Sequence, residues 1–163
     1  MNARADTIVT AFGRPVQAMA RAFDLLQPLL ALGIRIWVGL QFWKSGVLKI
    51  TSWDTTLYLF TNEYHTPLLP PEVAAVAGTF GELFFPILLW LGLFGRLGAL
   101  GMFAVNAMAV ISYQQVLLAE GFEAALAQHV LWGFMLIVLM VYGPGKLSLD
   151  HLLFNSRGHQ TTV

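Results

Sequence analysis

Four long apolar segments dominate the sequence and limit what the chain can fold into. They cover residues 29–50, 73–94, 97–117 and 125–142, and each is close to the roughly 20 residues with which an α-helix crosses a bilayer. Only helices and closed barrels satisfy the backbone inside lipid, so segments of this length predict membrane-spanning helices. Charged residues make up 11% of the 163 residues, against about 25% in soluble domains. We therefore predict an all-α integral membrane protein, a bundle of four transmembrane helices.

The connections between these segments predict how the helices are arranged. Two links are tight turns, at residues 95–96 and around residue 121, and short links make sequential helices antiparallel neighbours. The link over residues 51–72 is longer. Three of its apolar residues recur at helical spacing: Leu57, Phe60 and Tyr64. This pattern predicts a short helix that lies flat in the membrane interface on the outer side.

Residues 14–26 separate apolar and polar side chains onto different faces of a helix. The apolar face holds Val16, Met19, Phe23 and Leu26. This pattern predicts an amphipathic helix on the cytoplasmic membrane surface; the alternative is that these residues extend the first span into water. We accordingly divide the chain into a cytoplasmic N-terminal segment (residues 1–28), a four-helix membrane domain (29–153) and a flexible cytoplasmic tail (154–163).

Basic residues gather on one side of the predicted bundle. They are Arg4, Arg14, Arg21, Arg96, Lys146 and Arg157. The opposite side carries Lys49 among several acidic residues. Because Lys and Arg are concentrated in cytoplasmic segments of membrane proteins, both termini are predicted to be cytoplasmic.

Composition also narrows the possible partners and cofactors. The formal net charge is zero, which gives no indication of a nucleic-acid partner. The chain has no cysteine, so disulfides, iron–sulfur clusters and thiolate-bound cofactors are not expected. No metal-binding motif is present, and the first two dozen residues lack the apolar core of a signal peptide. The lipid bilayer is the partner that composition predicts directly.

Ionisable side chains inside the predicted spans identify a candidate site. Arg35 lies about a third of the way along the first span and Glu82 about halfway along the second. An intramembrane charge is costly, so it usually faces the protein interior and a partner. We predict that Arg35 pairs with Glu82 at the floor of a polar cavity, with Asn106 of the third span in the same layer. The alternative for this pair is a purely structural role in fixing helix register.

A second layer of polar residues is predicted nearer the outside. Lys49 shares a helix face with Arg35 and Phe42, because the three positions are seven residues apart. His129 and Gln114 lie near the outer ends of their spans. We predict that Lys49, His129 and Gln114 line the mouth of the cavity.

The second layer also has simpler interpretations. Lys44 is out of phase with Arg35 and is expected to face away. Asn106 can serve as a helix–helix contact, and His129 as an ordinary packed histidine. A haem ligated by His65 and His129 is considered because both histidines are expected toward the outer side, but no motif supports it.

Several motifs of the chain occur together in a known family. The first span carries R-x3-G-x2-F-x3-G-x2-K, which is Arg35, Gly39, Phe42, Gly46 and Lys49. An intramembrane Glu82 precedes a glycine-bounded turn, and the sequence GPGKLSLDHLL covers residues 143–153. In this order the motifs resemble the DoxX family of small four-span bacterial membrane proteins over about residues 29–153. The resemblance implies a location in the bacterial inner membrane.

The resemblance also suggests two functions. Namesakes of the family are linked to a thiosulfate:quinone oxidoreductase, so one hypothesis is a redox-associated subunit whose polar cavity binds a quinone or a small electron donor. In that hypothesis Arg35 would orient an anionic or carbonyl oxygen of the ligand, and Glu82 would hold Arg35 and relay a proton. Relatives are also associated with oxidative-stress and metal-stress gene clusters. The alternative is therefore a non-enzymatic anchor or assembly factor for a soluble partner, and a protein partner subunit or homo-oligomer fits either hypothesis.

Overall fold

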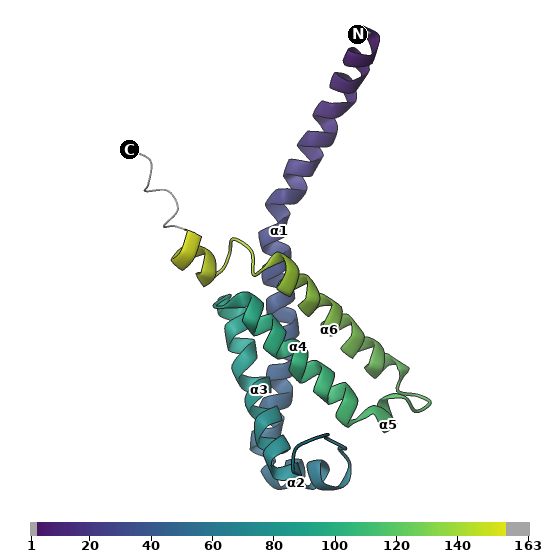
Figure 1. The fold of residues 1–163 in the computed structure, drawn as a ribbon, viewed down its shortest axis with the longest axis vertical. Helices are drawn as coiled ribbons and strands as arrows, with labels where there is room; N and C mark the ends of the chain where they lie inside the picture. The colour runs from purple at the N-terminus through teal and green to yellow at the C-terminus, as the bar shows by residue number, and fades with distance from the viewer. Residues whose placement is uncertain (1–2, 156–163) are drawn as a thin grey trace.

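The structure, a computed structural model, describes the backbone of residues 3–155 and the side chains of residues 15–154. Its helices are α1 (Ala3–Thr51), α2 (Trp53–Asn62), α3 (Pro71–Leu91), α4 (Gly95–Ser112), α5 (Gln114–Leu117), α6 (Glu123–Tyr142) and a π-helix, η1 (His151–Asn155) (Figure 1). Within this range there is no strand. Four of the described helices, α1, α3, α4 and α6, are long and apolar enough to cross a membrane. The prediction of an all-α, four-span membrane protein is confirmed.

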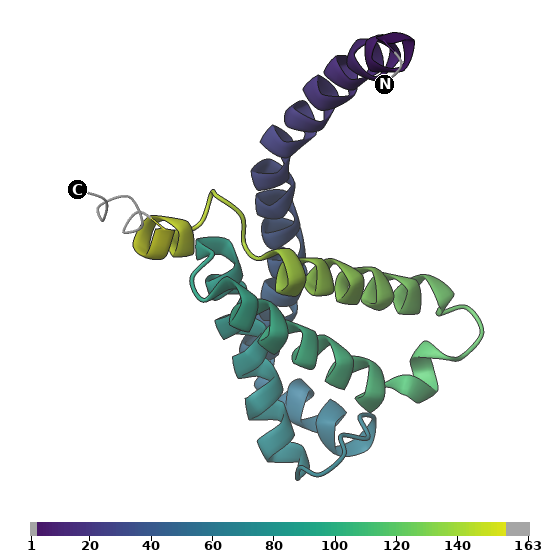
Figure 2. The same cartoon turned by 45° about the horizontal axis from the view of Figure 1, so that its top comes forward.

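The four long helices form a bundle that is narrow at one end and wide at the other. α1 packs along α3, α3 along α4, and α4 along α6, whereas α1 and α6 contact each other much less. In both ribbon views the C-terminal end of α6 lies close to α1, at the end of the bundle that carries η1. From there α6 diverges from α1 toward its own N-terminus, at the end that carries α2 and α5 (Figures 1 and 2). We call the end that carries η1 the narrow end of the bundle, and the end that carries α2 and α5 the wide end.

Apolar side chains from all four spans fill the narrow part of the bundle. The buried core consists of Val38, Phe42, Leu89, Ala99, Met102, Leu136 and Leu139. A smaller cluster of Phe60, Ala74 and Ala75 holds α2 against the start of α3. The short helix predicted in the long connection is present as α2, with Tyr64 just beyond its end.

The N-terminal part of the chain differs from the prediction. Residues 14–26 do not form a separate helix, because α1 runs without a break from Ala3 and contains both Pro15 and Pro28. A proline inside a helix removes one hydrogen bond and bends the axis without ending the helix when both flanks favour helix. Figure 2 shows this half of α1 curving away from the bundle. The apolar residues predicted for its membrane-facing side, among them Val16, Phe23 and Leu26, are exposed.

The third span is also shorter than predicted. α4 ends at Ser112, and residues 114–117 form the separate helix α5. Tyr113 between them has φ −119° and ψ 21°, which is outside the helical region. The two polar residues that follow, Gln114 and Gln115, are exposed at the wide end of the bundle. The prediction extended this span to residue 117 because apolar residues continue to that point. Hydropathy does not detect a break in the helix such as the one at Tyr113.

Glycine lets α1 and α3 approach each other closely at two points. At Gly39 an added Cβ would lie 2.4 Å from Nε1 of Trp90, so the indole occupies the space that a side chain would need. The same indole donates to the carbonyl of Ile36 at 3.4 Å and packs against Trp43 with a ring-centroid distance of 5.4 Å. Trp90 is therefore held from two directions and cannot move away easily.

We predict that Gly39→Ala destabilises the protein by about 1–3 kcal/mol, because the new methyl group overpacks the contact with Trp90. Equilibrium unfolding in mixed micelles measures the change. Gly33→Ala on the same helix is the matched control, since an added Cβ there meets nothing within 4 Å. An equal effect of the two substitutions would show that close contact with Trp90 does not matter for stability.

Candidate functional site

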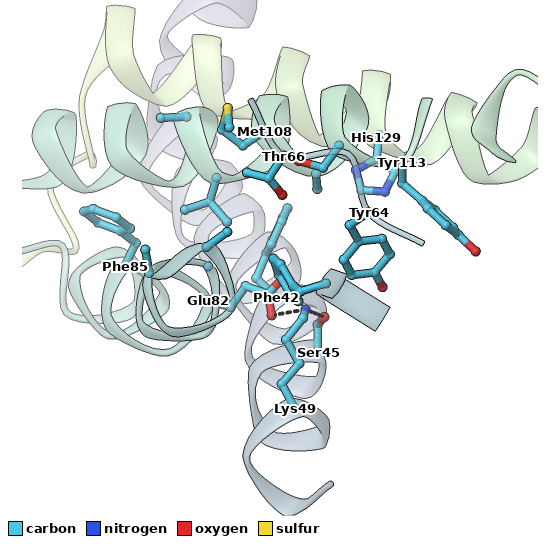
Figure 3. A pocket seen from close by; sticks show the side chains of 18 of the residues that line it. Phe42, Ser45, Lys49, Tyr64, Thr66, Glu82, Phe85, Met108, Tyr113 and His129 are labelled. Atoms are coloured by element: carbon cyan, nitrogen blue, oxygen red, sulfur yellow. Dashed lines mark hydrogen bonds and ion pairs between the residues drawn. The ribbon is translucent and has the colours of Figure 1, made fainter. Parts of the chain in front are cut away.

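A cavity of about 490 Å³ occupies the wide part of the bundle (Figure 3). Side chains of α1, α3, α4 and α6 form its walls, and residues from the end of α2 and the connection to α3 complete it. Most of the wall is apolar or aromatic. The larger apolar residues are Phe42, Phe60, Leu69, Phe85, Val105, Met108, Leu117 and Trp132. The cavity is thus a largely apolar space inside the membrane-spanning part of the molecule.

An ion pair between α1 and α3 supplies the charged groups of the cavity. Lys49 Nζ lies 2.7 Å from Oε1 and 2.6 Å from Oε2 of Glu82, and 2.9 Å from Oγ of Ser45. The three ammonium hydrogens therefore have three acceptors. The side chains of Lys49 and Glu82 are 17% and 9% exposed. Gly46 makes the approach possible, because a Cβ at this position would lie 3.1 Å from Cβ of Glu82.

The predicted pair between Arg35 and Glu82 is wrong, and the register of α1 against α3 explains why. Gly46 lies beside Glu82, Gly39 beside Trp90 and Arg35 beside Gly92. Residues 82 and 92 are ten positions apart, which is about 15 Å along a helix axis. Span boundaries read from hydropathy are uncertain by about a turn at each end, so depth alone did not distinguish Arg35 from Lys49 as the partner of Glu82.

Arg35 instead holds the C-terminal segment at the narrow end of the bundle. Its side chain is fully buried, and Nη2 donates to the carbonyl of Leu147. Its Nη1 lies against the α3–α4 turn, where a Cβ on Gly92 would be 2.0 Å away. Within the described part of the chain, Nε and Nη1 have no hydrogen-bond partner. Arg35 is not among the residues that line the cavity.

Asp150 closes the same end by capping α4. Its Oδ1 accepts from the backbone N–H of Phe94 at 2.8 Å, and its Oδ2 accepts from that of Gly95 at 2.7 Å. Its own N–H donates to the carbonyl of Gly92 at 3.1 Å. A carboxylate in this position satisfies backbone donors at the start of a helix and stabilises the helix dipole. Residues 143–150 (GPGKLSLD) therefore fasten the C-terminal segment to the α3–α4 turn. We call this segment the clasp.

His129 and Asn106 form a second polar group, on the α4–α6 side. Nδ2 of Asn106 donates to the carbonyl of His129 at 2.9 Å, and Oδ1 of Asn106 lies 2.8 Å from Nδ1 of His129. His129 lines the cavity, whereas the buried Asn106 lies behind it. The ring of His129 also meets Trp132 edge-on, with centroids 5.0 Å apart. His129 is thus held in one orientation at the cavity wall.

The other predicted lining residue, Gln114, is exposed on α5 and is not part of the cavity wall. Its neighbour Gln115 has the more specific contacts: its Nε2 donates to the carbonyl of Glu63 at 2.6 Å and lies 3.0 Å from Nδ1 of His65. These contacts join the long connection to α5. His65 is not a cavity residue, so the two histidines considered for haem do not share a site.

Of the predicted site residues, the structure brings Lys49, Glu82 and His129 to one cavity. It also adds polar residues that the sequence did not single out. These are Gln41, Ser45, Tyr64, Thr66, Ser112 and Tyr113. Ser45 was recognisable, because it lies one turn before Lys49 on the same face. Thr66 was not, since its position depends on how the long connection folds.

Tyr64 and Thr66 contribute hydroxyl groups from outside the spans. Burial raises the pKa of the Tyr64 phenol, and Tyr113, Glu82 and Glu63 raise it further. Tyr64 therefore stays neutral and keeps its proton at physiological pH. Oγ1 of Thr66 is buried and has no hydrogen-bond partner among the described residues. In the described part of the chain, no three His, Asp or Glu side chains converge as metal ligands would.

The fold and the site together define a class: a four-span helical membrane protein with an internal, largely apolar cavity that contains an ion pair. The sequence profile of the DoxX family matches residues 30–115, more than half of the chain, and this chain belongs to the DoxX family. The match runs from the second half of α1 through α4 and ends before α6 and the clasp. No curated protein matches the chain significantly, and no solved structure does.

We predict that Lys49→Met and Glu82→Leu each destabilise the protein by about 3 kcal/mol, because either change leaves one buried charge without its partner. The double variant should lie within about 1 kcal/mol of the wild type, since both charges are then gone. Equilibrium unfolding in mixed micelles of all four proteins gives the coupling energy. Lys44→Met, at an exposed position of the same helix, is the control. Additive losses in the double variant would contradict a coupled pair.

Asp150→Ala is predicted to lower stability by about 1–2 kcal/mol, because two backbone N–H groups at the start of α4 lose their acceptor. Asp150→Asn keeps one acceptor oxygen and should lose less. Glu120→Ala removes an exposed carboxylate elsewhere and serves as the comparison. If Asp150→Ala and Glu120→Ala unfold alike, the carboxylate does not act as a cap.

Proposed function

We propose that the protein binds a quinone-class molecule in the cavity and acts as a redox-associated subunit in the bacterial inner membrane. The observation that carries this proposal is the cavity itself, which combines aromatic walls with the Lys49–Glu82 pair and His129. Small-molecule sites typically measure about 300–1,000 Å³ and are apolar with a few fixed polar groups. A flat ring with oxygens at its edge matches both the size and the distribution of polarity.

The route into the cavity supports a lipid-soluble ligand. α1 and α6 contact each other less than the other neighbouring spans do, and they diverge toward the wide end (Figure 1). Phe42 of α1 and Trp132 of α6 both line the cavity, and their rings meet edge-on between the two helices, with centroids 5.4 Å apart. A molecule dissolved in the bilayer would enter between these two helices. A water-soluble substrate would lose its hydration in a site with apolar walls and gain few hydrogen bonds in return.

Within this proposal, Glu82 and His129 are the groups that can exchange a proton with a bound ligand. Lys49 holds the Glu82 carboxylate in position through its two short contacts. Arg35 has no part in the proposed chemistry, because its guanidinium lies against Gly92 and outside the cavity. Lys146 and Arg96 lie toward the clasp end, and Glu63 and Glu120 lie toward the α2–α5 end. This distribution of charge supports cytoplasmic termini.

The protein in lipid nanodiscs is predicted to bind a short-chain ubiquinone saturably, as measured by isothermal titration calorimetry. Ala109→Phe places a ring in the cavity, which Ala109 lines, and should weaken binding at least tenfold. Ala124→Phe, at an exposed position of α6 outside the cavity lining, should bind as the wild type does. Partitioning into lipid is measured with empty nanodiscs and subtracted.

A second function has one observation in its favour. The N-terminal half of α1 extends beyond the bundle, and its apolar residues Met19, Phe23 and Leu25 are exposed. Such a helix can anchor a soluble partner in a stress- or metal-response system. Absence of saturable quinone binding, together with a partner that purifies in fixed stoichiometry with the protein, would reject the quinone proposal in favour of this anchor function.

A further inference from the structure

The hydrogen bonds around His129 determine which of its ring nitrogens carries the proton. The carbonyl of His129 can only accept, so the group of Asn106 that lies 2.9 Å from it must be the donating Nδ2. This fixes the orientation of the amide and places Oδ1 at 2.8 Å from Nδ1 of His129. Because Oδ1 can only accept, Nδ1 is the protonated nitrogen. The neutral ring therefore keeps a lone pair on Nε2.

This Nε2 is available to a molecule in the cavity. His129 lines the cavity, and Figure 3 shows its ring at the wall near Tyr64, across from the Lys49–Glu82 pair. The only hydrogen bond of the imidazole within the described part of the chain is the one from Nδ1 to Asn106. The α4–α6 side of the cavity thus presents a fixed hydrogen-bond acceptor.

The ion pair on the α1–α3 side also offers acceptors in place of donors. All three N–H groups of Lys49 are directed at Ser45 and at the two carboxylate oxygens of Glu82, so none is left for a ligand. Each oxygen of Glu82 accepts one of these bonds and keeps a further lone pair. The amide of Gln41 and the hydroxyls of Tyr64 and Thr66 also line the cavity, and each can donate or accept, so they do not favour either kind of ligand.

We propose that the cavity is selective for the reduced, dihydroxy form of its ligand, a quinol, with one hydroxyl donating to Nε2 of His129. This inference rests on the proposed function and adds the redox state that the site prefers. A quinone has only carbonyl oxygens, which accept hydrogen bonds and cannot donate them. Facing the acceptor atoms of His129 and Glu82, these oxygens form no hydrogen bond. One well-placed hydrogen bond corresponds to about a tenfold difference in affinity.

The test compares dissociation constants of three ligands with the same ring: a short-chain ubiquinol, its quinone and the quinol dimethyl ether. Binding is measured anaerobically in nanodiscs by calorimetry. We expect the wild type to bind the quinol about tenfold more tightly than the other two. His129→Phe should reduce quinol affinity to that of the quinone and leave quinone affinity unchanged.

Two further variants keep the result interpretable. His65→Phe makes the same substitution at a histidine outside the cavity lining and should keep the wild-type preference. His129→Phe leaves Asn106 without its partner, so H129F/N106L is made as well, because removing both polar groups costs less stability than removing one. The double variant should also bind quinol and quinone equally.

Equal binding of quinol and quinone by the wild type would overturn the selectivity and leave the proposed quinone site intact. A preference for quinol that survives in H129F and in H129F/N106L would overturn the role of His129. Failure of all three ligands to bind the wild type would reject the quinone site itself, and the selectivity with it.

Discussion

The ion pair between Lys49 and Glu82 is the interaction on which the arrangement of the helices depends. Two charges in the interior of a membrane domain are tolerated only when they meet each other and their remaining hydrogen-bonding capacity is used. Lys49 meets this requirement with three acceptors, and Gly46 provides the close approach of α3 that the short distances need. A sliding of α1 against α3 by one turn would separate the charges. The pair therefore selects one register out of several that the apolar surfaces alone would allow.

This register separates the molecule into two ends with different properties. At one end Trp90 lies in the space above Gly39, and Arg35 lies beside Gly92 under the clasp, so that the helices are in close contact. At the other end α6 diverges from α1, and the cavity lies among α1, α3, α4 and α6. Of the polar side chains of the cavity, Ser45, Lys49 and Glu82 come from the two helices that this register aligns. The cavity and the clasp thus lie toward opposite ends of the same bundle.

The sequence predicted the number and type of the spans because a stretch of some 20 apolar residues has few other uses. It also predicted that Lys49 faces the interior while Lys44 is exposed, since this depends only on helical period. The partner of Glu82 was predicted wrongly because pairing depends on the register between two helices, which hydropathy locates only to within about a turn. The contacts of Arg35 were not predictable from the spans, since Leu147 lies outside all four of them. Tyr64 and Thr66 lie in the connection between α2 and α3. Its path depends on tertiary contacts, so helical periodicity could not predict that these residues reach the cavity.

The clasp has a consequence for the order in which the protein is made. Arg35 belongs to the first span, but its hydrogen-bond acceptor is the carbonyl of Leu147, 112 residues later in the chain. The backbone N–H groups of Phe94 and Gly95, at the start of α4, likewise have their acceptor in Asp150, near the end of the membrane domain. These groups of the first three spans can meet the partners that they have in the folded protein only after residues 147–150 have been synthesised. Completion of the bundle is therefore a late event that depends on the last part of the membrane domain to be translated.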